Sequence, residues 1–334
     1  MECSGEMRAM LVAVIALAAC RGHEDRPAPR PAPPPVQQVT PKAPAPDPWA
    51  ATPKRPSDAP PTLAERHELA DKACPSVTAP FFYRIERGGA TSYILGTRHI
   101  GVPLAKFPQV VRDQLHGARL AVFEVAPDDD GTVQRPEIDV KAALGAADWT
   151  KLEALIGRDT ALEVATGRPS GGVLAMMIMY EDPSAMLDNE IQHEVLAEHI
   201  PARGLESSKF QDDLIDKLLD LRALKASIEQ TKDRAELEHD SEKDLSEYCA
   251  GTDDQPGMDP DQRKEWLAAG YTDAELDAMD DELVFRRNAK WIPELEPLLA
   301  KGGVFIAVGA DHLIGPRGVV SLLRKRGFTL TRLK

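Results

Sequence analysis

Two short apolar runs, far apart in the chain, share one pattern of hydrophobic and polar positions. Residues 92–99 read SYILGTRH and residues 304–312 read VFIAVGADH. Each apolar run stops at a glycine, and a histidine, His99 or His312, follows three positions later. A continuous apolar run bounded by glycine is typical of a buried strand in a parallel sheet. The glycine allows a sharp turn or a close approach of the backbone. Both runs are therefore predicted to be buried strands.

The segments after the two histidines are also alike. The first motif is followed by a predicted helix over residues 108–116 and a strand over residues 120–125. The second is followed by a predicted helix over residues 318–326 and a strand over residues 328–333. We therefore predict an α/β fold whose sheet is built from two pseudo-symmetric strand–GxxH–helix–strand units, with a helical middle region between them.

The position of the two histidines suggests a site. Ligands of open α/β sheets bind outside the carboxyl ends of the strands, where His99 and His312 are both expected. If the two units pair about a pseudo-twofold axis, the histidines face one another across one pocket. The alternative is that each histidine is a capping or core residue at its own turn.

An acidic residue closes another predicted strand. Residues 81–85 and 91–95 predict a hairpin around a Gly-Gly pair, and the later strand at residues 120–125 reads LAVFEV. A carboxylate in such an apolar run is costly to bury unless it is paired or bound. Glu124 is therefore a candidate site residue, and the alternative is a strand-end carboxylate turned to solvent.

The middle of the chain reads mainly as helices. Residues 172–180 predict a core helix, and residues 211–231 predict an amphipathic helix. A short strand over residues 203–206 ends in the carboxylate of Glu206. Residues 232–283 are rich in aspartate and glutamate, and we expect them to form a solvated, mostly helical excursion. An amphipathic helix over residues 283–299 leads into the second motif.

The N-terminal region predicts a lipoprotein. Residues 7–19 form a short apolar run typical of a secretory signal, and residues 17–20 (LAAC) resemble a bacterial lipobox. We therefore predict a signal peptide over residues 1–19, acylation of Cys20, and a proline-rich linker over residues 20–62. Residues 63–334 form the predicted folded domain. Arg21 resembles the residue of the outer-membrane sorting class, so we expect anchorage in the bacterial cell envelope, on the outer membrane.

Charge and cysteine content narrow the picture further. The net charge of −14 argues against a surface that binds nucleic acid. Cys3 leaves with the signal peptide and Cys20 carries lipid, which leaves Cys74 and Cys249 in an oxidising compartment. These two cysteines form one disulfide or are two unrelated buried thiols, and we favour the disulfide.

His99, Glu124 and His312 offer two imidazoles and one carboxylate. This set suits Zn, Mn, Co or Fe and leaves positions open for water, whose pKa the metal lowers. A nearby arginine would hold a carboxylate or a developing oxyanion. In a second scheme, which needs no metal, a histidine paired with Glu124 is a general base that activates a water molecule to attack an ester or amide.

The chain from about residue 80 to the end resembles the TraB/GumN family, which includes the Tiki proteases. The resemblance is carried by the two GxxH motifs and by shorter matching pieces: residues 122–125 (VFEV), 187–188 (LD), 204–206 (GLE), 287–288 (RN), and a glycine- and leucine-containing tail after His312. Arg98 and Asp311 depart from the family pattern, in which apolar residues are more usual inside the motifs.

The resemblance implies an α/β fold related to erythromycin-esterase-like and haem-binding ChaN-like proteins. It also implies that His99, Glu124 and His312 are catalytic and metal-binding, that Arg287 acts with them, and that Glu206 has a secondary role. Two functions follow as alternatives. The first is a membrane-tethered, divalent-metal-dependent hydrolase, a peptidase of Tiki type. The second is a non-catalytic lipoprotein that binds a peptide, haem or another small ligand.

Overall fold

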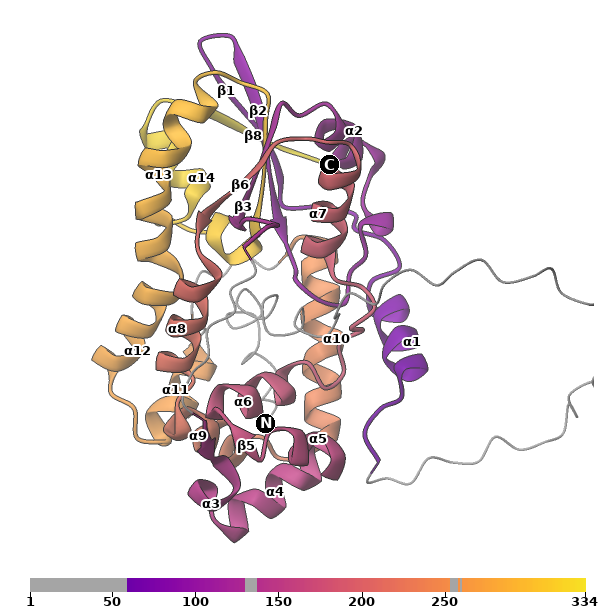
Figure 1. The fold of residues 1–334 in the computed structure, drawn as a ribbon, viewed down its shortest axis with the longest axis vertical. Helices are drawn as coiled ribbons and strands as arrows, with labels where there is room; N and C mark the ends of the chain where they lie inside the picture. Colours follow the sequence, from indigo (N-terminus) through magenta and orange to yellow (C-terminus); the bar gives the residue numbers. More distant parts are fainter. Residues whose placement is uncertain (1–58, 130–136, 253–257, 259) are drawn as a thin grey trace, which may run out of the picture.

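The computed structural model describes residues 59–129, 137–252, 258 and 260–334 (Figure 1). The predicted signal peptide, Cys20 and nearly all of the linker lie outside these residues and stay predictions. Within the described part of the chain, no helix is both long and apolar enough to cross a membrane.

A six-stranded sheet forms the centre of the fold, in the order β6-β3-β7-β2-β1-β8. Strands β2, β7, β3 and β6 are parallel, and β1 pairs antiparallel with both β2 and β8. The strands are β1 (Phe82–Arg87), β2 (Ala90–Thr97), β3 (Leu120–Val125), β6 (Ala202–Glu206), β7 (Val304–Gly309) and β8 (Thr329–Leu333). The two apolar runs of the GxxH motifs, β2 and β7, form strands of a parallel sheet, as predicted, and the structure places them side by side.

The strands form where the sequence pattern places them. Gly88 and Gly89 both have positive φ, 58° and 84°, and make the tight turn between β1 and β2. A two-residue turn of this kind suits the right-handed twist of a hairpin. Every residue of β7 is buried, which accounts for its continuous apolar run.

Each central strand leads to a second strand through a short helical connection. Strand β2 is followed by η2 (Leu104–Lys106), α2 (Gln109–His116) and β3. Strand β7 is followed by η4 (Ala310–Leu313), α14 (Val319–Lys325) and β8. The first connection passes beyond β7 to reach β3, and the second passes beyond β2 and β1 to reach β8. The helix and strand that were predicted after each motif are thus present.

Gly96, the glycine of the first motif, is required by packing. A Cβ at this position would lie 2.9 Å from Ala310 Cα and 2.9 Å from Phe81 Cβ, closer than side-chain carbons approach. Gly96 therefore lets the first GxxH segment pack directly against the second, which continues from Ala310 to His312.

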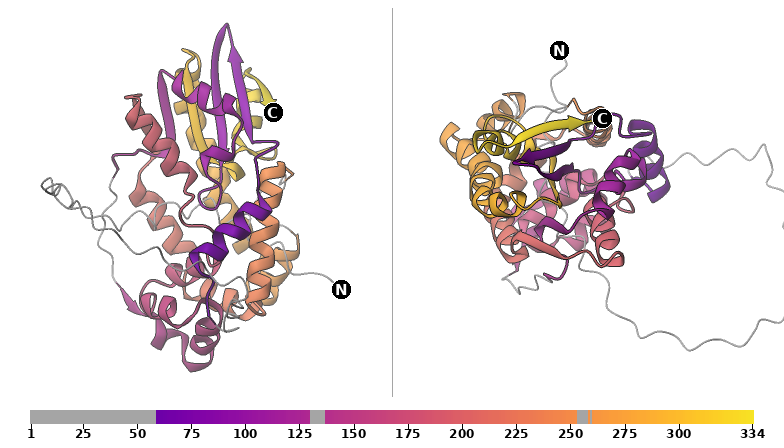
Figure 2. Two further views of the ribbon diagram at one scale, coloured as in Figure 1. Left: turned by 90° about the vertical axis from the view of Figure 1, so that its right-hand side faces the viewer. Right: turned by 90° about the horizontal axis from the view of Figure 1, so that it is seen from above.

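Helices surround the sheet and form a separate region beyond one of its ends (Figures 1 and 2). The helices outside the two connections are α1 (Leu63–Ala73), α3 (Val140–Leu144), α4 (Ala146–Ile156), α5 (Arg158–Glu163), α6 (Pro169–Met177), α7 (Leu187–Ala197), α8 (Ser208–Leu218), α9 (Leu221–Gln230), α10 (Arg234–Ala250), α11 (Pro260–Ala268), α12 (Asp273–Asp280) and α13 (Arg286–Leu299). A small two-stranded sheet pairs β4 (Ile138–Asp139) with β5 (Thr166–Gly167).

Two expectations about the middle region need correction. Residues 211–231 are not one helix, because Asp220 caps the start of α9 and separates it from α8. The described residues between 232 and 283 are mainly helical and are not simply solvated, since α10 packs against α1 and α6. Asp240 and Asp244 on α10 are buried. A net-acidic composition did not reveal that one face of this helix belongs to the core.

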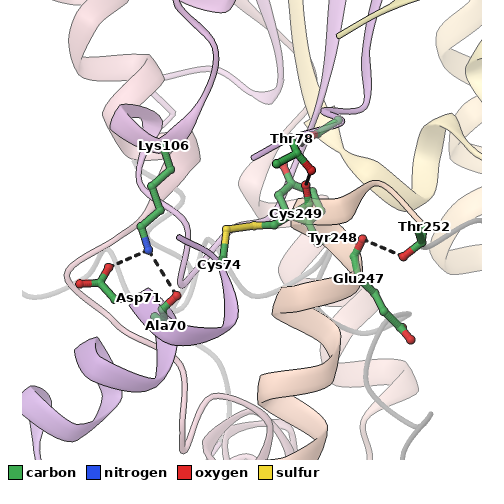
Figure 3. Close-up of a disulfide and its surroundings, with 10 residues drawn as sticks. Ala70, Asp71, Cys74, Thr78, Lys106, Glu247, Tyr248, Cys249 and Thr252 are labelled. Carbon is green, nitrogen blue, oxygen red and sulfur yellow. Dashed lines mark hydrogen bonds and ion pairs between the residues drawn. A yellow bond between two sulfur atoms is a disulfide. The ribbon is translucent and has the colours of Figure 1, made fainter. Parts of the chain in front are cut away.

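The structure joins Cys74, just after α1, to Cys249 at the end of α10 by a disulfide (Figure 3). This is the pairing favoured by the cysteine count. Both cysteines are buried. The carbonyl of Cys249 accepts hydrogen bonds from the backbone N–H groups of Thr78 and Ala79, which fixes the end of α10 against the segment that enters β1.

Candidate active site

The candidate residues gather at the carboxyl ends of the four parallel strands. Thr97 is level with Gly309 across the β2–β7 pair, and Val125 is level with Glu206 across the β3–β6 pair. His99 and His312 follow β2 and β7 directly, and Glu124 and Glu206 lie at the ends of β3 and β6. Both histidines are therefore in the zone where ligands of α/β sheets bind.

A cavity of about 130 Å³ opens at this edge of the sheet. It is lined by residues from β3 and the segment after it, from β7, from the first motif, from the first half of α7 and from α8: His99, Phe123, Glu124, Val125, Ala126, Pro127, Asp129, Asp188, Asn189, Gln192, Gln211 and Ala307. His99 and Glu124 thus share one cavity. His312 is not among these lining residues, so the two histidines do not face one another across this cavity.

His99 is held by a carboxylate from α7. Its Nδ1 makes a short hydrogen bond with Asp188 Oδ2, and the Oγ1 of Thr97 donates to the other oxygen of Asp188 at 2.8 Å. All three side chains are buried. Because Asp188 accepts from Nδ1, the proton of a neutral ring sits on that nitrogen, and Nε2 carries the lone pair.

Glu124 is paired inside the protein and does not turn to solvent. Its Oε1 accepts the backbone N–H of Gly309 at 2.7 Å, and its Oε2 accepts from Gln211 Nε2 at 2.9 Å and from Arg287 Nη2 at 2.5 Å. The Gly309 contact ties the end of β3 to the glycine of the second motif. The cost of burying this carboxylate is thus offset by three donors, one of them charged.

Arg287 links the two buried glutamates to His312. Its guanidinium donates to both oxygens of Glu206, to Glu124 and, from Nη1, to His312 Nε2 at 3.1 Å. Burial opposes the charge of Arg287, but attraction by Glu124 and Glu206 outweighs it, so the pKa of the guanidinium is raised. Arg287 therefore stays positively charged.

A π-helical turn precedes this arginine. Residues Asp281–Phe285 form the turn η3, and the carbonyl of Leu283 in it accepts a hydrogen bond of 2.8 Å from Arg287 Nη1. Single π turns inside helices are frequent at functional sites. Here the turn supplies a backbone acceptor for the guanidinium as α13 begins.

His312 is completely buried and does not line the cavity. Its Nδ1 is 2.7 Å from Asn288 Oδ1, and its ring centre is 4.5 Å from that of Trp291. Burial, Arg287 and His99 together hold the pKa of His312 well below its ordinary value. The ring is therefore neutral, with its proton on Nδ1 and its Nε2 lone pair turned to the arginine.

The three predicted metal ligands do not fit a metal ion in this arrangement. Both oxygens of Glu124 accept from N–H donors, and the lone pair of His312 Nε2 accepts from Arg287. Nδ1 of His99 is bonded to Asp188. Across residues 59–129, 137–252 and 260–334, no three His, Cys, Asp or Glu side chains are placed to hold one ion. The guanidinium of Arg287 occupies the position toward which Oε2 of Glu124 and Nε2 of His312 point.

Sequence reasoning missed the residues that orient the predicted ones. Gln211 on α8 donates to both Glu124 and Glu206, and Trp291 Nε1 donates to Glu206 at 3.3 Å. Asp188 and Asn288 stood out in the sequence only as parts of short matching pieces. One available signal was the spacing of Arg287 and Trp291, since residues four apart share a helix face.

A model of the TraB/PrgY/gumN family matches residues 81–332, from just before β1 to within β8. The chain belongs to the TraB/PrgY/gumN family. The resemblance seen in the sequence is therefore confirmed, and the matched range includes His99, Glu124, Glu206, Arg287 and His312. No curated protein and no solved structure matches the chain.

In this TraB/PrgY/gumN member, Arg98, inside the first GxxH motif, is buried and paired. Arg98 Nη2 makes a buried ion pair of 2.8 Å with Glu181, and Ser241 Oγ on α10 donates to the same carboxylate oxygen at 3.0 Å. The arginine inside the first GxxH motif thus connects the site to α10.

Proposed function

We propose that this protein is a hydrolase that cleaves an ester, amide or peptide bond in the cavity at the carboxyl edge of the sheet. The observation that carries the proposal is the buried His99–Asp188 pair, which lines the same cavity as Glu124. A histidine held in one tautomer by a carboxylate is a recurrent general base. Within the family, a peptidase of Tiki type is the activity that we expect.

In the proposed mechanism His99 is the catalytic base and Asp188 is its positioning residue. Nε2 of His99 takes a proton from a water molecule as the water oxygen attacks the carbonyl carbon of the substrate. Asp188 stabilises the imidazolium that forms. His99 then returns the proton to the leaving alcohol or amine as the carbonyl re-forms and the bond to the leaving group breaks.

The cavity also offers stabilisation for the oxyanion of the tetrahedral intermediate. Asp188, Asn189 and Gln192 all come from the first half of α7, whose N-terminus carries a partial positive charge. Gln192 lines the cavity, and its side-chain amide carries N–H donors. Donors placed where negative charge develops are a large source of rate acceleration.

The divalent metal expected from the sequence stays a prediction. Mn, Co, Zn or Fe would polarise the substrate carbonyl and lower the pKa of a bound water. Because Oε2 of Glu124 and Nε2 of His312 accept hydrogen bonds from Arg287, no step of the proposed mechanism passes through a metal. Metal content is therefore measured in the same experiment as activity.

One observation favours the alternative of a non-catalytic binding protein. The polar side-chain atoms of Glu124, Arg287 and His312 are all hydrogen-bonded within the protein. The size of the cavity limits what such a protein would hold. Ligand pockets for drug-sized molecules span roughly 300–1,000 Å³. At about 130 Å³, this cavity is smaller than that range and suits a single side chain or a small polar group.

The cellular setting is also part of the proposal. Acylation of Cys20 would tether the domain to the outer membrane of a bacterial envelope. The substrate would be a peptide or a small molecule. The two strand–GxxH units would be related by a pseudo-twofold axis between β2 and β7, which is supported by their matching order of elements.

The test compares four proteins made as the full chain in detergent: wild type, His99→Ala, Asp188→Asn and His193→Ala. His193 is an exposed histidine on the same helix as Asp188 and serves as the matched control. Each is assayed on peptide and ester libraries, with chelator and with added Mn, Co, Zn or Fe, and analysed for bound metal.

Hydrolysis that survives chelator, is lost in His99→Ala and persists in His193→Ala supports the proposed base. Hydrolysis that requires a stoichiometric metal bound through His99 and His312 would replace the mechanism by the metal-dependent one. Saturable binding of a small ligand without turnover under any of these conditions would favour the binding protein.

A further inference from the structure

Arg287 occupies the centre of a cage that resembles a cation site. Two carboxylates, Glu124 and Glu206, and the Nε2 of His312 all direct acceptor atoms at its guanidinium. Carboxylates and an imidazole are the ligand types that Mn, Fe, Co and Zn take in proteins. The cage is thus chemically suited to a cation, and the cation present is a side chain.

The hydrogen bonds of His312 orient its lone pair toward the centre of this cage. Its Nδ1 is bonded to Asn288 Oδ1, so Nε2 is the atom that carries the lone pair. A metal-bound histidine commonly donates its other N–H to a carbonyl or carboxylate in the same way. In this protein the oriented lone pair accepts a hydrogen bond from Arg287 Nη1 at 3.1 Å.

The second layer of the cage is built around the guanidinium. Gln211 Nε2 bridges the two glutamates, Trp291 Nε1 donates to Glu206, and the carbonyl of Leu283 accepts from Arg287 itself. The arginine side chain is 3% exposed, and its charge offsets one of the two negative charges of the cage. A divalent ion at this place would have to displace a buried positive charge from all of these contacts.

We propose that Arg287 takes the place of a metal ion in the Glu124–Glu206–His312 cage, so that this member of the family binds no divalent metal there. The arginine supplies the positive charge that holds the ends of β3 and β6 and the second GxxH motif together. The inference does not depend on the hydrolysis proposed for His99, because it concerns a separate set of contacts.

The inference predicts that removing the arginine creates a metal site. Wild type, Arg287→Ala and Arg286→Ala are prepared as the full chain, treated with chelator, and titrated with Mn²⁺, Co²⁺ and Zn²⁺ by calorimetry and elemental analysis. Arg286 is the exposed neighbour on the same helix and controls for loss of a surface charge. Thermal unfolding with and without each ion gives an independent readout.

Arg287→Ala should bind about one ion per chain at least ~100-fold more tightly than wild type, since a buried like charge beside the ion has been removed. It should lose this ion when His312→Ala is added. Its unfolding temperature should rise with the ion, whereas wild type and Arg286→Ala should not respond. If Arg287→Ala does not fold without metal, refolding with one of the three ions should rescue it, and Arg287→Gln should behave in the same way.

Two results would overturn the proposal. One is a stoichiometric ion in wild-type protein that is lost in both Glu206→Gln and His312→Ala. The other is the failure of both Arg287 variants, whether folded or offered metal during refolding, to gain affinity for any of the three ions.

Discussion

Removing the Cys74–Cys249 disulfide should destabilise the protein strongly. The two cysteines are 175 residues apart in sequence, and both sulfur atoms are buried. On the chain-entropy account, closing a loop of this length removes conformational freedom from the unfolded chain worth about 5 kcal/mol at 25 °C. For a domain of this size, each kcal/mol corresponds to roughly 2–4 °C in unfolding temperature. We therefore expect the unfolding temperature to fall by about 10–20 °C.

The effect is measured by urea unfolding of the oxidised wild type, the reduced wild type and the Cys74→Ala/Cys249→Ala double variant. Because the loss arises in the unfolded state, which expands without the cross-link, the denaturant slope should also increase. The reduced protein and the double variant should agree apart from about 1–2 kcal/mol for the missing sulfur atoms. A loss below ~1 kcal/mol, with an unchanged slope, would refute the entropic reasoning.

Three further predictions concern the site. Asp188→Asn should lower kcat by as much as ~10⁴-fold through the wrong tautomer of His99, with a smaller effect on KM, and an unchanged kcat would remove Asp188 from the mechanism. Gly96→Ala should lower the free energy of unfolding by about 1–3 kcal/mol through overpacking. Gly171→Ala on α6, whose Cβ would make only an ordinary van der Waals contact, should be neutral or stabilising. Equal free energies of unfolding for the two variants would contradict this prediction. Because the pKa of His312 is lowered from 6.5, the unfolded chain binds a proton below pH 6.5 that the folded chain does not. The free energy of unfolding should therefore fall as the pH drops below 6.5, and a urea series at several pH values should show a smaller fall for His312→Asn than for wild type.

Local pattern alone was enough to place the strands and most helices. The apolar runs that end in Gly96 and Gly309 are buried strands, and the Gly-Gly pair makes the hairpin turn. These features are encoded by neighbouring residues, because periodicity and glycine conformation act over a few positions. The same pattern, together with the rule for α/β sheets, put both histidines at the correct edge.

Only the tertiary structure decided which groups these residues meet. Asp188 comes from α7, Gln211 from α8 and Arg287 from α13, and their contacts with the motifs depend on how distant helices pack on the sheet. For that reason the two histidines, which look equivalent in the sequence, have different settings. His99 lines a cavity beside a carboxylate, and His312 is buried neutral beside an arginine. Burial and long-range pairing are properties of the packed chain, and no local pattern of residues encodes them.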